Sequence, residues 1–193
     1  LPDGARVLIF GDSWTWGEAA PPRQGYAYVI ADLTGWTTIV DGVRGSGYLR
    51  PGKGGGEFGE RIAALDPSLD PDLVIVQGSI NDRALHSQGY REAVTAAWDL
   101  LTAIYPKARI VVLGPAPHML PLEASLSAVD ADLADLAALR GWWYISPVAE
   151  QWITDANYLD VIDTSEAGRD HPSIDGHRYL AERLAASVAA ISR

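Results

Sequence analysis

Five short apolar runs alternate with segments of helical spacing, and this alternation constrains the fold more than any other feature. The runs are rich in branched side chains, as buried strands are, and they lie at 5–10, 37–42, 72–79, 108–115 and 142–147. Helical spacing marks 25–35, 60–65, 90–106, 122–141 and 173–192. Because strands that alternate with helices form a parallel sheet covered on both faces, the sequence predicts an α/β fold. We expect one domain over residues 1–193, a three-layer α/β/α sandwich around a five-stranded parallel sheet.

Polar or glycine-rich segments directly follow three of the predicted strands. They read GDSWTWG at 11–17, GVRGSG at 42–47 and GSIND at 78–82. The carboxyl ends of parallel strands meet at one edge of the sheet, where the active sites of such folds lie. The three segments are therefore expected to lie close together and to form a site.

Ser13 lies in the first of these segments and is a candidate nucleophile. A serine needs a base, usually a histidine, and the chain has four. His171 is favoured because Pro172 holds it on a loop before the last helix, which Ser173 is expected to cap. His177 falls inside that helix, where a packed or solvated role fits better. Taken alone, Ser13 fits a turn or a helix N-cap, so the pair gains weight only together with an oxyanion site.

The other two segments contain candidate oxyanion donors. Gly45 offers a backbone N–H that a substrate can approach without a Cβ in the way, and Asn81 offers a side-chain amide. Without a catalytic role, the glycine-rich stretch reads as a flexible surface loop and GSIND as a turn that closes a strand. Both interpretations stay open from the residues alone.

Four blocks in a fixed order resemble the SGNH (GDSL) hydrolase superfamily. They are GDSWTWG, GVRGSG, GSIND and, at 170–177, DHPSIDGH, and together they span nearly the whole chain. The resemblance implies a flavodoxin-like fold with strand order 2-1-3-4-5, and hydrolysis of an ester or acyl group without a metal. It implies that Ser13 is the nucleophile and His171 the general base. It also implies an oxyanion hole made by the N–H groups of Ser13 and Gly45 and the amide of Asn81.

The chain departs from the family pattern at the third catalytic group. The family usually has an Asp three residues before the histidine, and here that position is Gly168. Asp170 is next to His171, whereas Asp163 and Glu166 lie further upstream. Three alternatives remain: Asp170 reaches the ring, an upstream acid folds back, or a backbone carbonyl near Gly168 orients the ring. A carbonyl would fix the tautomer, which is part of the acid's role.

Aromatic residues flank the candidate nucleophile. Trp14 and Trp16 lie on either side of Thr15, and Tyr48 follows the glycine-rich loop. They predict either an aromatic wall that binds a sugar or an acyl group, or simple packing of the sheet edge.

Composition and charge narrow the range of partners. The chain has 48% hydrophobic and 21% charged residues, as globular proteins do, and a net charge of −10. An excess of acid disfavours nucleic acid as a partner, and no apolar run is long enough to span a membrane. We expect no metal and no cofactor, since there is no cysteine and no spaced set of metal ligands. The compartment stays open, with a secreted or cell-surface location favoured over the cytoplasm.

These observations predict a serine carboxylic-ester hydrolase. The expected partner is a small-molecule or carbohydrate ester, with acetyl as the favoured acyl group. Two alternatives remain: a non-catalytic glycan-binding module on the same fold, which the altered acid position suggests, and an acyltransferase that uses Ser13.

Overall fold

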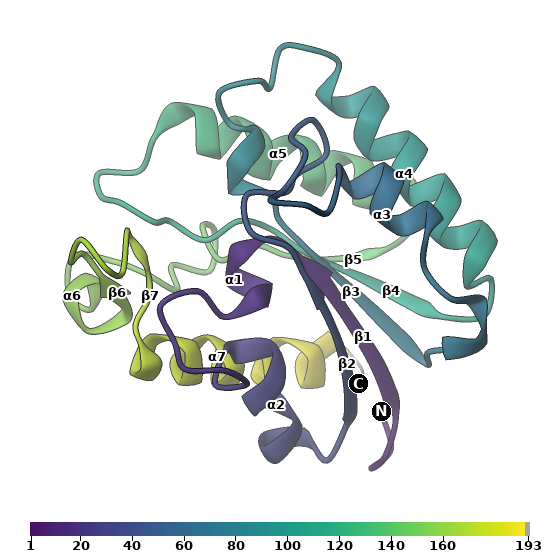
Figure 1. Ribbon diagram of the computed structural model, residues 1–193, viewed down its shortest axis with the longest axis horizontal. Coiled ribbons are helices and arrows are strands. Elements are labelled where there is room, and N and C mark those ends of the chain that lie inside the picture. Colours follow the sequence, from purple (N-terminus) through teal and green to yellow (C-terminus); the bar gives the residue numbers. More distant parts are fainter. Residues whose placement is uncertain (192–193) are drawn as a thin grey trace.

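The computed structural model describes residues 1–191, and a five-stranded sheet lies at its centre (Figure 1). The strands are β1 (Arg6–Gly11), β2 (Thr37–Gly42), β3 (Leu73–Gln77), β4 (Arg109–Leu113) and β5 (Trp143–Ile145). Their order across the sheet is β2-β1-β3-β4-β5, and every neighbouring pair is parallel. The predicted α/β fold and strand order are confirmed.

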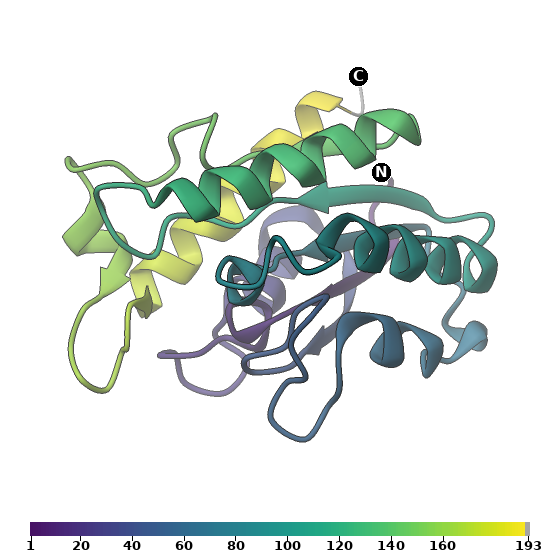
Figure 2. The same cartoon turned by 90° about the horizontal axis from the view of Figure 1, so that it is seen from above.

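Five longer helices cover the two faces of the sheet. Helices α2 (Tyr26–Thr34) and α7 (Ile174–Ile191) pack on one face, and α3 (Phe58–Ala63), α4 (Tyr90–Ile104) and α5 (Ala124–Leu139) on the other (Figures 1 and 2). Each was expected from its periodicity, with ends displaced by a few residues. The predicted end of the last helix at residue 192 lies outside the described residues. Ser173 caps α7 as expected, because its Oγ accepts the N–H of Gly176 at 2.9 Å.

The core consists of two apolar layers, one on each face of the sheet. The side chains facing α2 and α7 are Val7, Ile9, Leu73, Ile75, Val111 and Leu113. Those facing α3, α4 and α5 are Leu8, Phe10, Val74, Val76, Ile110 and Val112. Successive strand residues point to opposite faces, so a sheet covered on both sides needs apolar residues at every position. This is why the strands read as continuous apolar runs.

Six short elements were not expected from the sequence, because each has too few residues for a periodic pattern. They are α1 (Ser13–Trp16), the 3₁₀ helices η1 (Pro67–Leu69) and η2 (Ile80–Asp82), α6 (Tyr158–Val161), β6 (Ile162–Asp163) and β7 (His171–Pro172). Strands β6 and β7 form an antiparallel pair, which lies at the end of the molecule away from the N-terminus (Figure 2). Among residues 1–191, no helix is long and apolar enough to cross a membrane.

Candidate active site

A tight turn between β1 and α1 positions Ser13. Gly11 is required there, since a Cβ on it would stand 2.3 Å from Thr15 Oγ1. Asp12 caps the short helix: its Oδ1 accepts the N–H of Trp14 at 2.9 Å. Ser13 is then the first residue of α1 and is 6% exposed. In the sequence G-D-S, the glycine thus allows close packing of the turn, the aspartate caps the short helix, and the serine places its hydroxyl at the end of the strand.

His171 lies against this hydroxyl. Its Nε2 is 2.9 Å from Ser13 Oγ. On the other side of the ring, Nδ1 is 2.8 Å from the carbonyl oxygen of Arg169 and 3.1 Å from that of Gly168. A carbonyl oxygen only accepts, so Nδ1 carries the proton and Nε2 is free to accept the proton of Ser13. The ring thus has the tautomer that a general base needs.

Of the three alternatives for the group that orients His171, the structure has the backbone carbonyl. The carboxylate of Asp170 makes no hydrogen bond to the ring or to any other group in residues 1–191, so the expectation that it serves as the acid is not supported by its contacts. The upstream acids do not fold back either. Asp163 accepts the N–H of Ser165 at 2.9 Å, and Glu166 is exposed.

The close packing of the turn explains the glycine at position 168. A Cβ on Gly168 would stand 2.2 Å from Cγ of Asp163, so an aspartate does not fit there without movement of the backbone. The turn then passes through two residues with positive φ, Arg169 at 50° and Asp170 at 56°. This conformation directs two carbonyls toward the same ring nitrogen of His171, which explains how the site is oriented without the family's aspartate.

The three candidate oxyanion donors lie on loops that follow neighbouring strands. Ser13 begins a helix, so its N–H has no acceptor within α1. Gly45 has φ +73°, and among residues 1–191 no group accepts its N–H. One amide hydrogen of Asn81 is donated to the carbonyl of Ser46 at 2.9 Å, which leaves the second one available. All three groups retain an N–H for a substrate oxygen.

A buried carboxylate, Asp82, joins two of these loops. It accepts the N–H groups of Tyr48 at 2.8 Å and Leu49 at 2.9 Å. Gly47 leaves room for it, since a Cβ there would stand 2.5 Å from Oδ1 of Asp82. Burial raises the pKa of Asp82 to about 6, and it does the same to Asp12 in the turn that carries Ser13. From the sequence alone Asp82 is expected only as part of a turn. The structure shows that Gly47 is needed because the carboxylate of Asp82 occupies the space where a Cβ would lie.

Only one of the three candidate wall residues presents a surface to solvent. Trp14 and Tyr48 are 4% and 2% exposed, and both lie in the core, so the substrate-wall interpretation is corrected for them. The hydroxyl of Tyr48 accepts Nε1–H of Trp98 at 2.8 Å. Trp16 is 48% exposed, with the guanidinium of Arg44 5.4 Å from its ring centroid.

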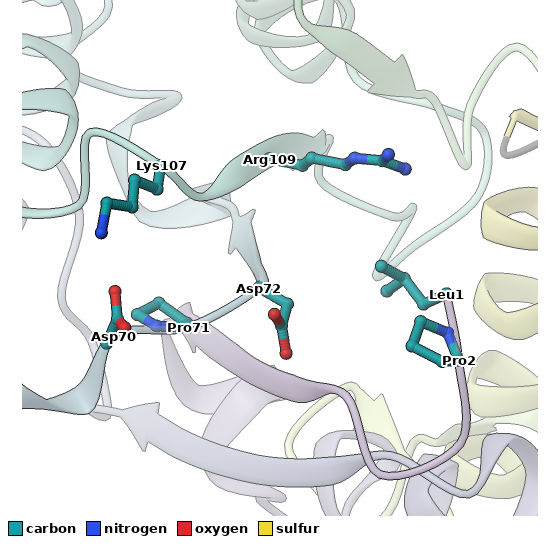
Figure 3. A pocket seen from close by; sticks show the side chains of 7 residues that line it. All are labelled: Leu1, Pro2, Asp70, Pro71, Asp72, Lys107 and Arg109. Carbon is teal, nitrogen blue, oxygen red and sulfur yellow. The ribbon is translucent and has the colours of Figure 1, made fainter.

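A depression of about 560 Å³ lies away from these groups (Figure 3). Leu1, Asp72 and Arg109 line it, and they precede or begin strands β1, β3 and β4. Figure 3 shows Lys107 pointing toward Asp70, with Arg109 extending to the other side. The depression is therefore at the amino edge of the sheet, opposite Ser13. In residues 1–191, no three His, Asp or Glu side chains gather in a way that could hold a metal ion.

Comparisons with known proteins identify the family of the chain. Residues 9–179 match the model of the GDSL-like lipase/acylhydrolase family. The chain is 28% identical over 196 residues to GDSL lipase Rv0518 of Mycobacterium tuberculosis, covering 95% of this chain and 81% of that protein.

Two solved esterase structures share the fold. A family two carbohydrate esterase from Cellvibrio japonicus has 21% identity and a TM-score of 0.69, over 99% of this chain and 62% of that one. Est24, a carbohydrate acetylesterase from Sinorhizobium meliloti, has 19% identity and a TM-score of 0.66, over 97% of this chain and 99% of that one. The expected relationship is thus confirmed: the chain is an ester-hydrolysing enzyme and belongs to the GDSL-like lipase/acylhydrolase family.

Proposed function

We propose that this enzyme releases short acyl groups, above all acetyl, from carbohydrate or small esters through an acyl-enzyme on Ser13. The observation that carries the proposal is the 2.9 Å contact between Ser13 Oγ and His171 Nε2, with Nδ1 of the same ring held by two carbonyls. A nucleophile within hydrogen-bond reach of a base that is itself oriented is the arrangement that covalent acyl transfer requires.

The steps follow from the positions of the protons. Nε2 of His171 takes the proton of Ser13 as Oγ attacks the ester carbonyl carbon. The N–H groups of Ser13 and Gly45 and the amide of Asn81 are the donors for the resulting oxyanion, and one such donor contributes about 10²–10³-fold in rate. Nε2–H then protonates the leaving alkoxide. Water enters, gives a proton to Nε2, and its oxygen attacks the acyl carbon. Nε2–H then returns the proton to Oγ of Ser13 as the bond between Oγ and the acyl carbon breaks, which releases the acid and regenerates the free serine.

The environment of the nucleophile supports a short acyl group and an exposed alcohol. A cavity beneath the turn, lined by Trp14, Ala116 and Leu180 among others, has a volume of about 10 Å³. That is room for about one water molecule, so no fatty acyl chain enters the fold there. Trp16, in contrast, offers an exposed ring next to the nucleophile turn, suited to the apolar face of a sugar. The carbohydrate esterases named above are consistent with this choice.

The decisive experiment measures hydrolysis of p-nitrophenyl acetate by the wild type and by Ser13→Ala. We expect the variant to lose activity by at least about 10⁴-fold, because both acylation and proton transfer need the hydroxyl. A serine-reactive organophosphate should label the wild type at Ser13 and leave the variant unlabelled. Wild-type turnover by Ser13→Ala would refute the assignment of the nucleophile.

A panel of substrates then tests the acyl and alcohol preferences. We expect rates to fall from acetyl to butyryl to octanoyl p-nitrophenyl esters, and acetylated xylan to release acetate. A faster reaction with octanoyl esters would exclude the short-acyl proposal. Product that forms on an added alcohol faster than on water would assign the acyltransferase alternative instead. The altered acid position no longer favours a non-catalytic module, since carbonyls orient the ring.

A further inference from the structure

Glu18 is a buried carboxylate that joins the two sides of the site. It follows Gly17, the residue that ends α1, and its side chain is 7% exposed. Oε1 accepts a hydrogen bond from Nη2 of Arg169, and Oε2 forms an ion pair with Nε of Arg44. Arg169 belongs to the turn before His171, whereas Arg44 belongs to the loop after β2. One carboxylate therefore connects two loops that are far apart in the sequence.

The backbone of Glu18 is fixed relative to the nucleophile. Its N–H donates to the carbonyl oxygen of Ser13 at 3.0 Å. Its own carbonyl accepts Nε2–H of His177 at 2.9 Å, and His177 is fully buried in α7. These two hydrogen bonds hold the backbone of Glu18 in a fixed position relative to the turn that carries Ser13.

Each of the two arginines is adjacent to a group that the proposed reaction uses. The carbonyl of Arg169 is 2.8 Å from Nδ1 of His171, so a movement of Arg169 moves the acceptor that orients the ring. Arg44 directly precedes Gly45, a candidate oxyanion donor. Arg44 and Arg169, the two partners of Glu18, therefore lie one and two residues away from groups of the proposed reaction.

The histidine turn needs such an attachment. Arg169 and Asp170 have φ of 50° and 56°, a conformation that side chains with a Cβ rarely adopt. The preceding residues 164–167 are exposed and contribute no core packing. A conformation of this kind persists where contacts from outside the turn hold it. The ion pair between Arg169 and Glu18 is such a contact.

We propose that Glu18 is a positioning residue for His171. Through its ion pair with Arg169, Glu18 holds in place the carbonyl that orients the imidazole. In this way a residue outside the histidine turn performs the orienting role that the family's aspartate would have. It acts through geometry, because its carboxylate binds the two arginines and makes no hydrogen bond to the ring. The inference rests on the proposed function of Ser13 and His171.

The kinetic test uses Glu18→Gln, Arg169→Met and the double variant, with Glu182→Gln as the matched control. Glu18→Gln removes the negative charge that pairs with the two arginines. Glu182→Gln makes the same chemical change at an exposed position of α7. We expect each single variant to lower kcat on p-nitrophenyl acetate about 10-fold with KM within about two-fold, since a misplaced base slows chemistry and leaves binding intact. The double variant should be no slower than the slower single one, because both break the same link. The control should keep wild-type rates.

A spectroscopic readout separates positioning from general stability. In ¹⁵N NMR spectra of the imidazoles, the Nδ1–H signal of His171 should shift or broaden in Glu18→Gln and Arg169→Met. The Nε2 signal of His86, whose Nε2 lies 2.6 Å from Oδ2 of Asp132, should not change. Wild-type kcat and an unchanged His171 signal in both variants would overturn the inference and leave the proposed function intact. A raised KM with unchanged kcat would overturn it too. If Glu18→Gln fails to fold, the same measurements on Arg169→Met test the inference, because Arg169 is exposed and its replacement should leave the fold intact. A wild type that neither hydrolyses esters nor reacts with organophosphate would instead refute the proposed function.

Discussion

The turn that carries Ser13 and the turn that carries His171 present the two groups of the proposed catalytic pair, but they are held in different ways. In the first, Asp12 and Thr15 are fully buried and Ser13 is 6% exposed. Thr15 Oγ1 donates to Gln77 Oε1 at 2.9 Å, which joins the turn to β3. In the second, residues 164–167 are exposed, and Arg169 is the side chain that reaches across to the nucleophile side.

This difference shows two physical routes to a preorganised site. The core and a network of buried hydrogen bonds position Ser13, so its placement depends on the stability of the whole fold. The placement of His171 depends on the two-residue pairing of β7 with β6, on two carbonyls and on one ion pair. Substitutions around Ser13 should therefore act mainly on stability, and substitutions around His171 mainly on rate.

The largest expected effect comes from Trp14→Ala on the nucleophile side. Trp14 is 4% exposed in the core, and removal of a buried Trp costs about 4 kcal/mol through lost contacts and the cavity left behind. Trp16→Ala is the matched control, with a cost of about 1 kcal/mol or less, because Trp16 is 48% exposed. Chemical denaturation measures both. Equal losses would show that the core does not hold this turn.

The next largest effect is expected for Asp82→Ala, which removes the carboxylate that links the loop after β2 to the loop after β3. The N–H groups of Tyr48 and Leu49 would lose their acceptor inside the protein, at a cost of about 3 kcal/mol in the free energy of unfolding. Asp32→Ala, at an exposed position on α2, should change stability by less than about 0.5 kcal/mol. Indistinguishable midpoints of urea unfolding for the two variants would show that the link through Asp82 does not stabilise the fold.

His177 should make stability depend on pH. Burial lowers its pKa to about 4, so between about pH 6.5 and pH 4 the unfolded chain binds a proton that the folded one does not. The stability that it contributes is thus present at neutral pH and is lost as the pH falls, by about 2 kcal/mol between pH 7 and pH 4.5.

The comparison with His177→Gln isolates this contribution. Asp12 and Asp82 act in the opposite direction, because burial raises the pKa of each to about 6 and the folded state protonates first. Both carboxyls are present in wild type and variant, so they cancel in the difference. The advantage of the wild type in urea unfolding should shrink as the pH falls. Parallel stability curves from pH 7 to pH 4.5 would exclude a neutral, buried His177.

The smallest effect is expected on the histidine side, for Asp170→Asn. Its carboxylate makes no hydrogen bond to His171, so kcat/KM on p-nitrophenyl acetate should stay within about two-fold of wild type. Replacement of a triad aspartate, in comparison, lowers kcat by about 10⁴-fold. A loss of 100-fold or more would show that Asp170 supports the imidazolium during the reaction and that the two carbonyls alone are insufficient.

Much of the fold could be predicted because its signals are local. The alternation of apolar runs and helical segments predicted the sheet, its parallel strands and the edge that carries the site. The short elements α1, η2 and β6–β7 were not predictable, since two to four residues carry no period. They are also the elements that present Ser13, Asn81 and His171. The strand pattern placed Ser13 and Asn81 at one edge of the sheet, whereas the order of the motifs was needed to add His171 to them.

The sequence by itself determined which side chains could react and at which edge of the sheet they meet. Only the tertiary structure decided what holds them. Trp14 and Trp16 look alike in the sequence, and the single turn of α1 sends one into the core and the other toward solvent. The link from Glu18 to Arg169 joins residues far apart in the chain, and such a contact leaves no spacing or pattern in the sequence because folding alone brings the two together.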